Sequence, residues 1–164
     1  MGIKGLSVRL VLAVAVLAIC PEAAKAASSG SVTITGKVPV SCNISVAAAA
    51  GASNIADLSQ GDTNRLVATV TENCNDPSGY SVTLTGTNSG NQGGLFKDSV
   101  SNATQSFTVT YNGATPSSQT VTDVTAPGNN VAKDVRITYA ANPSLTGSVG
   151  FTYAETLTFS ITAK

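Results

Sequence analysis

Residues 31–46, SVTITGKVPVSCNISV, alternate between polar and apolar positions. The even-numbered positions carry valine, isoleucine, cysteine or glycine, and the odd-numbered ones carry serine, threonine, lysine, proline or asparagine. This period of two predicts β-strand with one buried face. One strand of that length would reach about 50 Å, against about 17–20 Å for a typical strand. We therefore predict two strands that share one phase and are separated between Gly36 and Pro39.

The same alternation continues in shorter runs that are bounded by turn-forming residues. Strand candidates cover residues 66–71, 80–86, 95–96, 107–111, 121–124, 135–139 and 151–161. Turn signals lie at Asn75–Gly79, Asn112-Gly113 and Asn142-Pro143. Ala47–Ala52 is predicted to form a loop or a weak helical turn, and nothing predicts a longer helix. Short strands separated by such turns favour one all-β sandwich domain.

The N-terminal residues have the pattern of a secretory signal peptide. A basic start precedes the apolar run 10–19, and Ala24-Lys25-Ala26 forms an A-x-A cleavage motif. We expect a signal peptide at residues 1–26, cleaved between Ala26 and Ala27. A membrane anchor is a weaker alternative because the run is too short to span a bilayer. A lipoprotein at Cys20 is weaker still, since the preceding isoleucine is large.

Charge and cysteine content narrow the class of protein further. The chain has 9 basic and 9 acidic residues and no histidine, and the predicted signal removes mainly basic ones. The slightly acidic remainder gives no electrostatic reason to expect nucleic acid or an anionic membrane as a partner. Cys42 and Cys74 would remain and, in an oxidising compartment, most simply pair with each other. That bond closes a loop of about thirty residues, which contributes about 3–4 kcal/mol in the chain-entropy model.

Candidate chemistry in the sequence is sparse. Without histidine, Ser-His-Asp and Cys-His catalysis are excluded, and no P-loop, GxSxG or CxxC motif occurs. Metal binding by Cys42 and Cys74 is disfavoured, because no histidine is present to complete a site. Carboxylate pairs such as Asp57 with Asp62, or Asp123 with Asp134, are more simply solvated than catalytic. We therefore expect no enzyme activity, no cofactor and no metal. Glu155 is the one charged residue on the apolar side of the last run, which marks either an open strand edge or a functional position.

The segment GSVTITGKVPVSC resembles the N-terminus of bacterial chaperone–usher pilins. The matching positions are Gly30, Val32, Ile34, Gly36, Val38 and Cys42. The second cysteine closes the valine-rich run LVATVTENC, and Gly150 precedes the alternating C-terminal run, as in pilins. One departure is that pilins usually have a tyrosine next to last, whereas this chain ends Thr162-Ala163-Lys164. Spore-coat-U-like secreted proteins are similar too, since they share an SCNIS-like first cysteine.

The pilin resemblance implies an immunoglobulin-like β-sandwich that lacks its last strand. It implies a donor-strand arm at residues 27–38 followed by a sandwich domain at residues 39–164. In the arm, Val32 and Ile34 would be the apolar plugs, and Gly36 would lie where the arm leaves its neighbour. The groove that receives the arm would be lined by the C-terminal strand residues Leu157, Phe159 and Ile161.

The function that this resemblance implies is a structural subunit of a bacterial fimbria. Subunits would polymerise by donor-strand exchange and support adhesion at the cell surface. The expected partners are other copies of the subunit, a periplasmic chaperone and an outer-membrane usher, and the expected route is secretion through the periplasm. Two alternatives remain open. One is a spore-coat-U-like self-assembling envelope protein. The other is a monomeric immunoglobulin-like module, adhesive or carbohydrate-binding, that keeps the arm in its own sheet.

Overall fold

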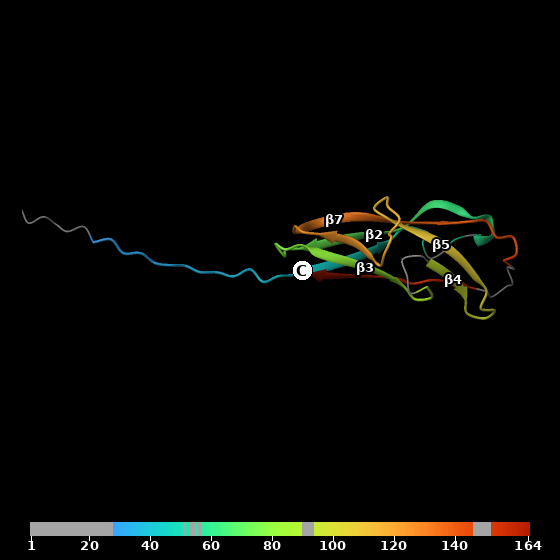
Figure 1. The fold of residues 1–164 in the computed structure, drawn as a ribbon, viewed down its shortest axis with the longest axis horizontal. Helices are drawn as coiled ribbons and strands as arrows, with labels where there is room; N and C mark the ends of the chain where they lie inside the picture. Colours follow the sequence, from blue (N-terminus) through green and yellow to red (C-terminus); the bar gives the residue numbers. More distant parts are fainter. Residues whose placement is uncertain (1–27, 51, 53–54, 56, 90–93, 146–151) are drawn as a thin grey trace, which may run out of the picture. The chain divides into compact units, whose positions relative to one another are not determined.

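The computed structural model of the 164-residue chain describes residues 28–50, 52, 55, 57–89, 94–145 and 152–164. The predicted signal peptide and the Ala26-Ala27 cleavage site lie outside these residues. The chain divides into two units, Met1–Gly36 and Lys37–Lys164, and each is considered by itself. In the first unit, the described residues 28–36 are exposed and have no regular secondary structure. The strands all belong to the second unit (Figure 1).

The second unit is all-β, as the alternating pattern predicts. Its described residues form nine strands and one single-turn 3-10 helix, η1 (Leu58–Gln60). The strands are β1 (Cys42–Ala48), β2 (Asp62–Cys74), β3 (Tyr80–Gly86), β4 (Gly94–Asp98), β5 (Thr104–Tyr111), β6 (Thr120–Val124), β7 (Gly128–Tyr139), β8 (Tyr153–Ala154) and β9 (Leu157–Ala163). They form two antiparallel sheets, in the orders β1-β2-β7-β5-β4-β8 and β6-β3-β9.

One hydrophobic core joins the two sheets. The six-stranded sheet contributes Val70, Val109 and Val135, each 0% exposed. The three-stranded sheet contributes Val82 and Leu84, also 0% exposed. These side chains occupy alternate positions on their strands, so the period of two in the sequence corresponds to the buried faces.

The predicted turns are present where their residue types require them. At the 75–79 turn, the Gly79 amide donates to the Asp76 carbonyl at 3.0 Å, and the Ser78 amide donates to Asp76 Oδ1 at 2.8 Å. Asn112 and Gly113 follow β5 with φ angles of 50° and 80°, the left-handed pair that a two-residue hairpin turn needs. These turn predictions are confirmed.

The prediction of one long strand over residues 151–161 is wrong. The described part of this run contains β8, which pairs with β4, and β9, which pairs with β3 in the other sheet. The chain therefore crosses between the sheets at Glu155 and Thr156. The Glu155 carboxylate accepts hydrogen bonds from the backbone amides of Asn88 (3.0 Å), Leu95 (3.2 Å) and Thr156 (2.9 Å). The charged residue on the apolar side of the run thus stabilises the crossing.

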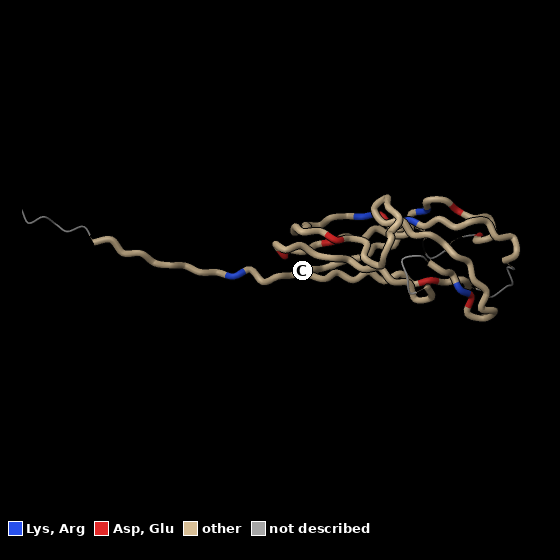
Figure 2. Tube along the Cα trace, in the orientation of Figure 1, with Lys and Arg blue, Asp and Glu red and all other residues tan. Residues whose placement is uncertain are grey.

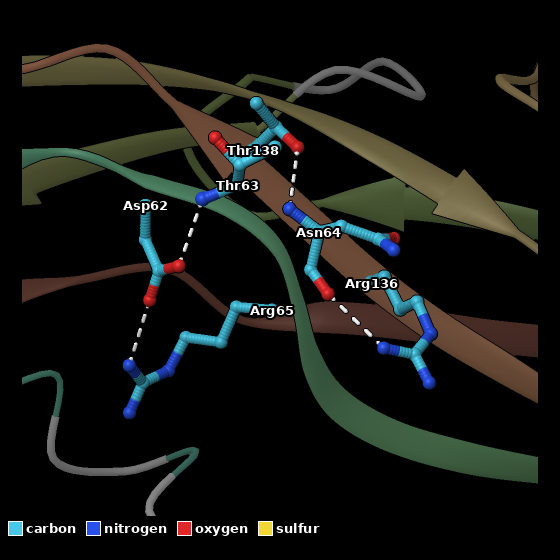
Figure 3. A network of polar contacts seen from close by, with 6 residues as sticks. All are labelled: Asp62, Thr63, Asn64, Arg65, Arg136 and Thr138. Atoms are coloured by element: carbon cyan, nitrogen blue, oxygen red, sulfur yellow. Dashed lines mark hydrogen bonds and ion pairs between the residues drawn. The ribbon is translucent and has the colours of Figure 1, made fainter.

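A second network of polar contacts surrounds a β-bulge at the start of β2 (Figure 3). Asn64 has a φ of 60°, and the register with β7 shifts between Asp62 and Arg65. The Asn64 amide donates to Thr138 Oγ1 at 2.9 Å, and Arg136 donates to the Asn64 carbonyl at 3.0 Å. The hydrogen bond from Arg65, at 2.8 Å, lowers the pKa of Asp62. Side chains here replace the ladder bonds that the bulge removes.

Candidate functional site: the open edge between β1 and β9

β1 and β9 are end strands of their sheets, and they contact each other. β1 is hydrogen-bonded to β2 and β9 to β3, and both lie at the end of their sheet order. They lie side by side in Figure 1, β1 in teal and β9 in dark red. No backbone hydrogen bond joins the two within the described residues. Each therefore presents an unpaired backbone edge on the same side of the molecule.

The two edge strands run in opposite directions. Cys42, at the start of β1, is opposite Cys74, at the end of β2. Ala163, at the end of β9, is opposite Tyr80, at the start of β3. Because a five-residue turn joins β2 to β3, the start of β1 and the end of β9 lie at the same end of the sheets. A strand placed between them would run antiparallel to one and parallel to the other.

Apolar side chains along this edge are incompletely covered. Val46 is opposite Val70 in the β1–β2 register, so both face the core, yet Val46 is 50% exposed and Val70 is 0% exposed. On β9, Phe159 is buried at 8% exposure, while Leu157 and Ile161 are only half-buried. These three are the residues that the sequence assigns to the groove, and the structure places them together on one strand. An apolar strip along β1 and β9 therefore remains only partly covered.

The predicted disulfide between Cys42 and Cys74 is confirmed. The two cysteines are direct cross-strand partners and are 32 residues apart in the chain. Since Cys74 is 1% exposed, the bond fixes the start of the edge strand β1 to the core of the six-stranded sheet. β1 is thereby held in place, although within the described ranges it has a strand partner on one side alone.

The predicted arm residues Val32, Ile34 and Gly36 belong to the first unit, whereas the last two residues of the arm and the residues predicted to line the groove belong to the second. Val32 and Ile34 are 83% and 89% exposed. An added Cβ at Gly36 would meet no atom within 4 Å. Further along, Val38 and Val40 are 85% and 56% exposed. The apolar side chains ahead of β1 therefore keep the alternation seen in the sequence, but most of their surface is exposed.

Sequence analysis missed the role of Asn75 at the junction between the arm and β1. Asn75 was predicted only to begin a turn. Its side-chain Nδ2 donates to the Pro39 carbonyl at 2.9 Å, and its Oδ1 accepts from the Ser41 amide at 2.7 Å. Its backbone amide also donates to the Ser41 carbonyl at 3.1 Å. No local pattern marks this role, because the partners are 34 and 36 residues away.

A buried polar cluster around Glu72 was also missed. Glu72 is 0% exposed, and its carboxylate accepts hydrogen bonds from Tyr111 (2.5 Å), Thr122 (2.7 Å) and Tyr80 (3.0 Å). Lys133 Nζ lies 3.2 Å from the same carboxylate. Burial and the neighbouring carboxylate raise the pKa of Tyr80 to about 12. Both carboxylate oxygens have partners, so the cluster ties the two sheets together and offers no group for catalysis. The available signal was an acidic residue on the buried side of LVATVTENC.

Other candidate positions offer less. Each of the four aspartates named in the sequence analysis has a partner in the structure. Asp57 accepts a hydrogen bond from the Ser59 amide. The other three form ion pairs, Asp62 with Arg65, Asp123 with Lys164 and Asp134 with Arg136. An open depression of about 340 Å³ lies beside Asn88 and Glu155. The side chains of both residues form hydrogen bonds with backbone groups of the protein. No group of three His, Cys, Asp or Glu residues that could hold a metal occurs among the described residues. Acidic and basic residues are sparse and interspersed in the view of Figure 2.

Comparison with known proteins leaves the edge as the main guide to function. No family model, no curated protein and no solved structure matches the chain. Within the described residues, we find no helix of the length and apolar character needed to cross a membrane. The sequence pattern and the geometry of the β1–β9 edge are therefore the features that bear on function.

Proposed function

We propose that this protein is a pilin-type structural subunit, an incomplete immunoglobulin-like sandwich that polymerises by donor-strand exchange. The N-terminal arm of one copy fills the β1–β9 edge of the next copy. The observation that carries this proposal is the 50% exposure of Val46, opposite the fully buried Val70. It lies at an edge where, among the residues that the structure describes, neither strand has a second partner. A missing strand accounts for the unpaired backbone and the uncovered side chains together.

The arm has the chemistry that this edge requires. Val32 and Ile34 are two positions apart and separated by a polar residue, so they fall on one face of an extended strand. The half-buried Leu157 and Ile161 and the buried Phe159 of β9 recur with the same period. Backbone hydrogen bonds to the open edge would supply affinity, and alternate side chains would supply fit. Each plug contributes roughly 1.5–3 kcal/mol if it becomes fully buried.

This contact is head-to-tail, so it propagates as a fibre instead of closing into a ring. The signal-like residues 1–26 and the disulfide support secretion through an oxidising periplasm to the cell surface. A periplasmic chaperone would cover the open edge until an outer-membrane usher delivers the next subunit. The subunit carries out no reaction of its own and supports adhesion as part of the fimbria.

The test compares two arm variants of the secreted full-length protein. Ile34→Asp places a charge at a position destined for an apolar pocket, so ladders of SDS-resistant polymer and fibres in electron micrographs should disappear. Thr33→Asp places the same charge on the opposite face of the same arm, so polymerisation should persist. Both variants should keep the wild-type melting temperature as monomers. Equal polymerisation by the two variants would refute the proposal, and equal loss of fold would place Ile34 in the core of its own subunit.

The alternatives give different results in the same experiment. A monomeric carbohydrate-binding module predicts that the wild-type protein itself forms no polymer at any concentration. A spore-coat-U-like envelope protein predicts polymers in cells that lack a chaperone and usher.

A further inference from the structure

The short segment between the arm and β1 is held straight by Asn75. The side-chain amide of Asn75 bonds the Pro39 carbonyl and the Ser41 amide, the groups on either side of Val40. A carbonyl and an amide that flank one residue point to the same side only when that residue is extended, as in a parallel strand ladder. The Asn75 side chain therefore replaces a strand partner and fixes Val40 in extended conformation.

Proline makes this constraint necessary. The fixed φ of Pro39 suits the second position of a β-turn, in which Val40 would be the third residue and could not be extended. Because Asn75 holds Val40 extended, a Pro39-Val40 turn cannot form, and Cys42 is fixed by its disulfide. The nearest place where the chain can reverse easily is Gly36-Lys37, outside the constrained segment.

A reversal at Gly36-Lys37 places the arm out of reach of its own groove. In such a hairpin, Ile34 would come to lie opposite Pro39 and Val32 opposite Ser41. Both plugs would therefore lie ahead of Cys42, while the proposed groove follows β1, which begins at Cys42. Ile34 would stop about 10 Å short of the start of the groove, at about 3.3 Å per residue.

We propose that Asn75 is a positioning residue that keeps the arm out of the groove of its own chain and so reserves it for a second copy. This inference rests on the proposed function, because it concerns the choice between two acceptors for the same arm. Without the Asn75 side chain, residues 39–41 can turn, and Val32 and Ile34 can then enter the groove of their own subunit. Such a self-complemented monomer has neither a free arm nor an open edge, so it cannot join a fibre.

The test compares Asn75→Ala with Asn73→Ala in the full secreted protein. Asn73 lies on the same stretch of chain, and its Nδ2 donates to Asn130 Oδ1 at 3.4 Å, away from the junction. Hydrogen–deuterium exchange of residues 30–38 in the monomer fraction reports whether the arm is inserted, and SDS-resistant ladders report assembly. Asn75→Ala should protect the arm amides of the monomer and lower polymer yield about tenfold, the effect of losing about two hydrogen bonds. Asn73→Ala should behave as wild type, and Asn75→Asp, which keeps the acceptor for Ser41, should be intermediate.

Two results would overturn the inference. One is an Asn75→Ala monomer whose arm amides exchange as freely as those of the wild type. The other is a loss of polymer without arm protection, which would show simple damage to the fold. If wild-type protein never polymerises, the proposed function fails. Arm protection in Asn75→Ala but not in wild type would still support the positioning role.

Discussion

Removing the cation from the buried Glu72 cluster is the sharpest perturbation of stability that the structure suggests. Lys133 Nζ lies 3.2 Å from a Glu72 carboxylate that is 0% exposed, while the Lys133 side chain is 14% exposed. Lys133→Met keeps most of the aliphatic stem and leaves the buried carboxylate without its counter-charge. Breaking a buried ion pair in this way costs about 3–5 kcal/mol. We expect the lower end, about 3 kcal/mol, because three hydroxyl groups still donate to the carboxylate.

Urea unfolding of monomeric protein with the disulfide intact measures this loss as a lower midpoint with an unchanged slope. The control is Lys164→Met, which breaks an exposed contact with Asp123 and should cost less than about 1 kcal/mol. Glu72→Gln combined with Lys133→Met should cost less than the sum of the single changes, because the two groups interact directly. A loss below about 1 kcal/mol for Lys133→Met, or strict additivity in this cycle, would show that the cluster does not act as a buried ion pair.

Three further predictions follow from packing, the disulfide and tyrosine ionisation. Gly94→Ala should lower the free energy of unfolding by about 1–3 kcal/mol, since the new Cβ would lie 1.7 Å from Cζ of the buried Phe107 ring. An unchanged melting temperature would contradict this expectation. Replacing Cys42 and Cys74 by serine should lower the free energy of unfolding by about 3–4 kcal/mol in urea, and a loss below about 1 kcal/mol would be too small for the closed loop. Tyr80 should contribute stability that is intact below pH 10.0 and lost as the pH rises toward about 12, because its folded pKa is the higher one. Tyr80→Phe should flatten that alkaline decline in unfolding experiments, and an unchanged decline would be evidence against it.

Local features of the fold could be predicted from the sequence because their causes are local. Tyr80–Gly86 alternates without interruption and is bounded by turn residues, so its strand has the predicted limits. Asn112-Gly113 forms its turn because these two residue types tolerate positive φ. By contrast, β2 is 13 residues long and only residues 66–71 were predicted, since residues 62–65 are all polar or charged and the acidic Glu72 interrupts the apolar side of the run.

Features that depend on which strands become neighbours could not be predicted. The run 151–161 keeps one apolar phase throughout, yet its chain changes sheet at Glu155, whose carboxylate binds the amides of Asn88 and Leu95. Alternation records which way side chains point and carries no information on which sheet they enter. Glu72 illustrates the same limit, because its four partners come from four different strands.

The candidate site likewise has one part that the sequence predicts and one part that it does not. The sequence shows that Val46 shares the phase of Cys42, and so predicts that it faces inward. Whether an inward residue is covered depends on the strand beside it, and only the sheet order reveals that β1 has no second strand partner in the described part of the chain. The proposed arm is therefore predictable from a sequence pattern, whereas the proposed groove depends on the topology of the sheets. Asn75 connects them, since it lies in the body and holds the residues from which the arm departs. In the exchange between copies that we propose, the choice of acceptor thus depends on a side chain that neither the pattern nor the sheet order would single out.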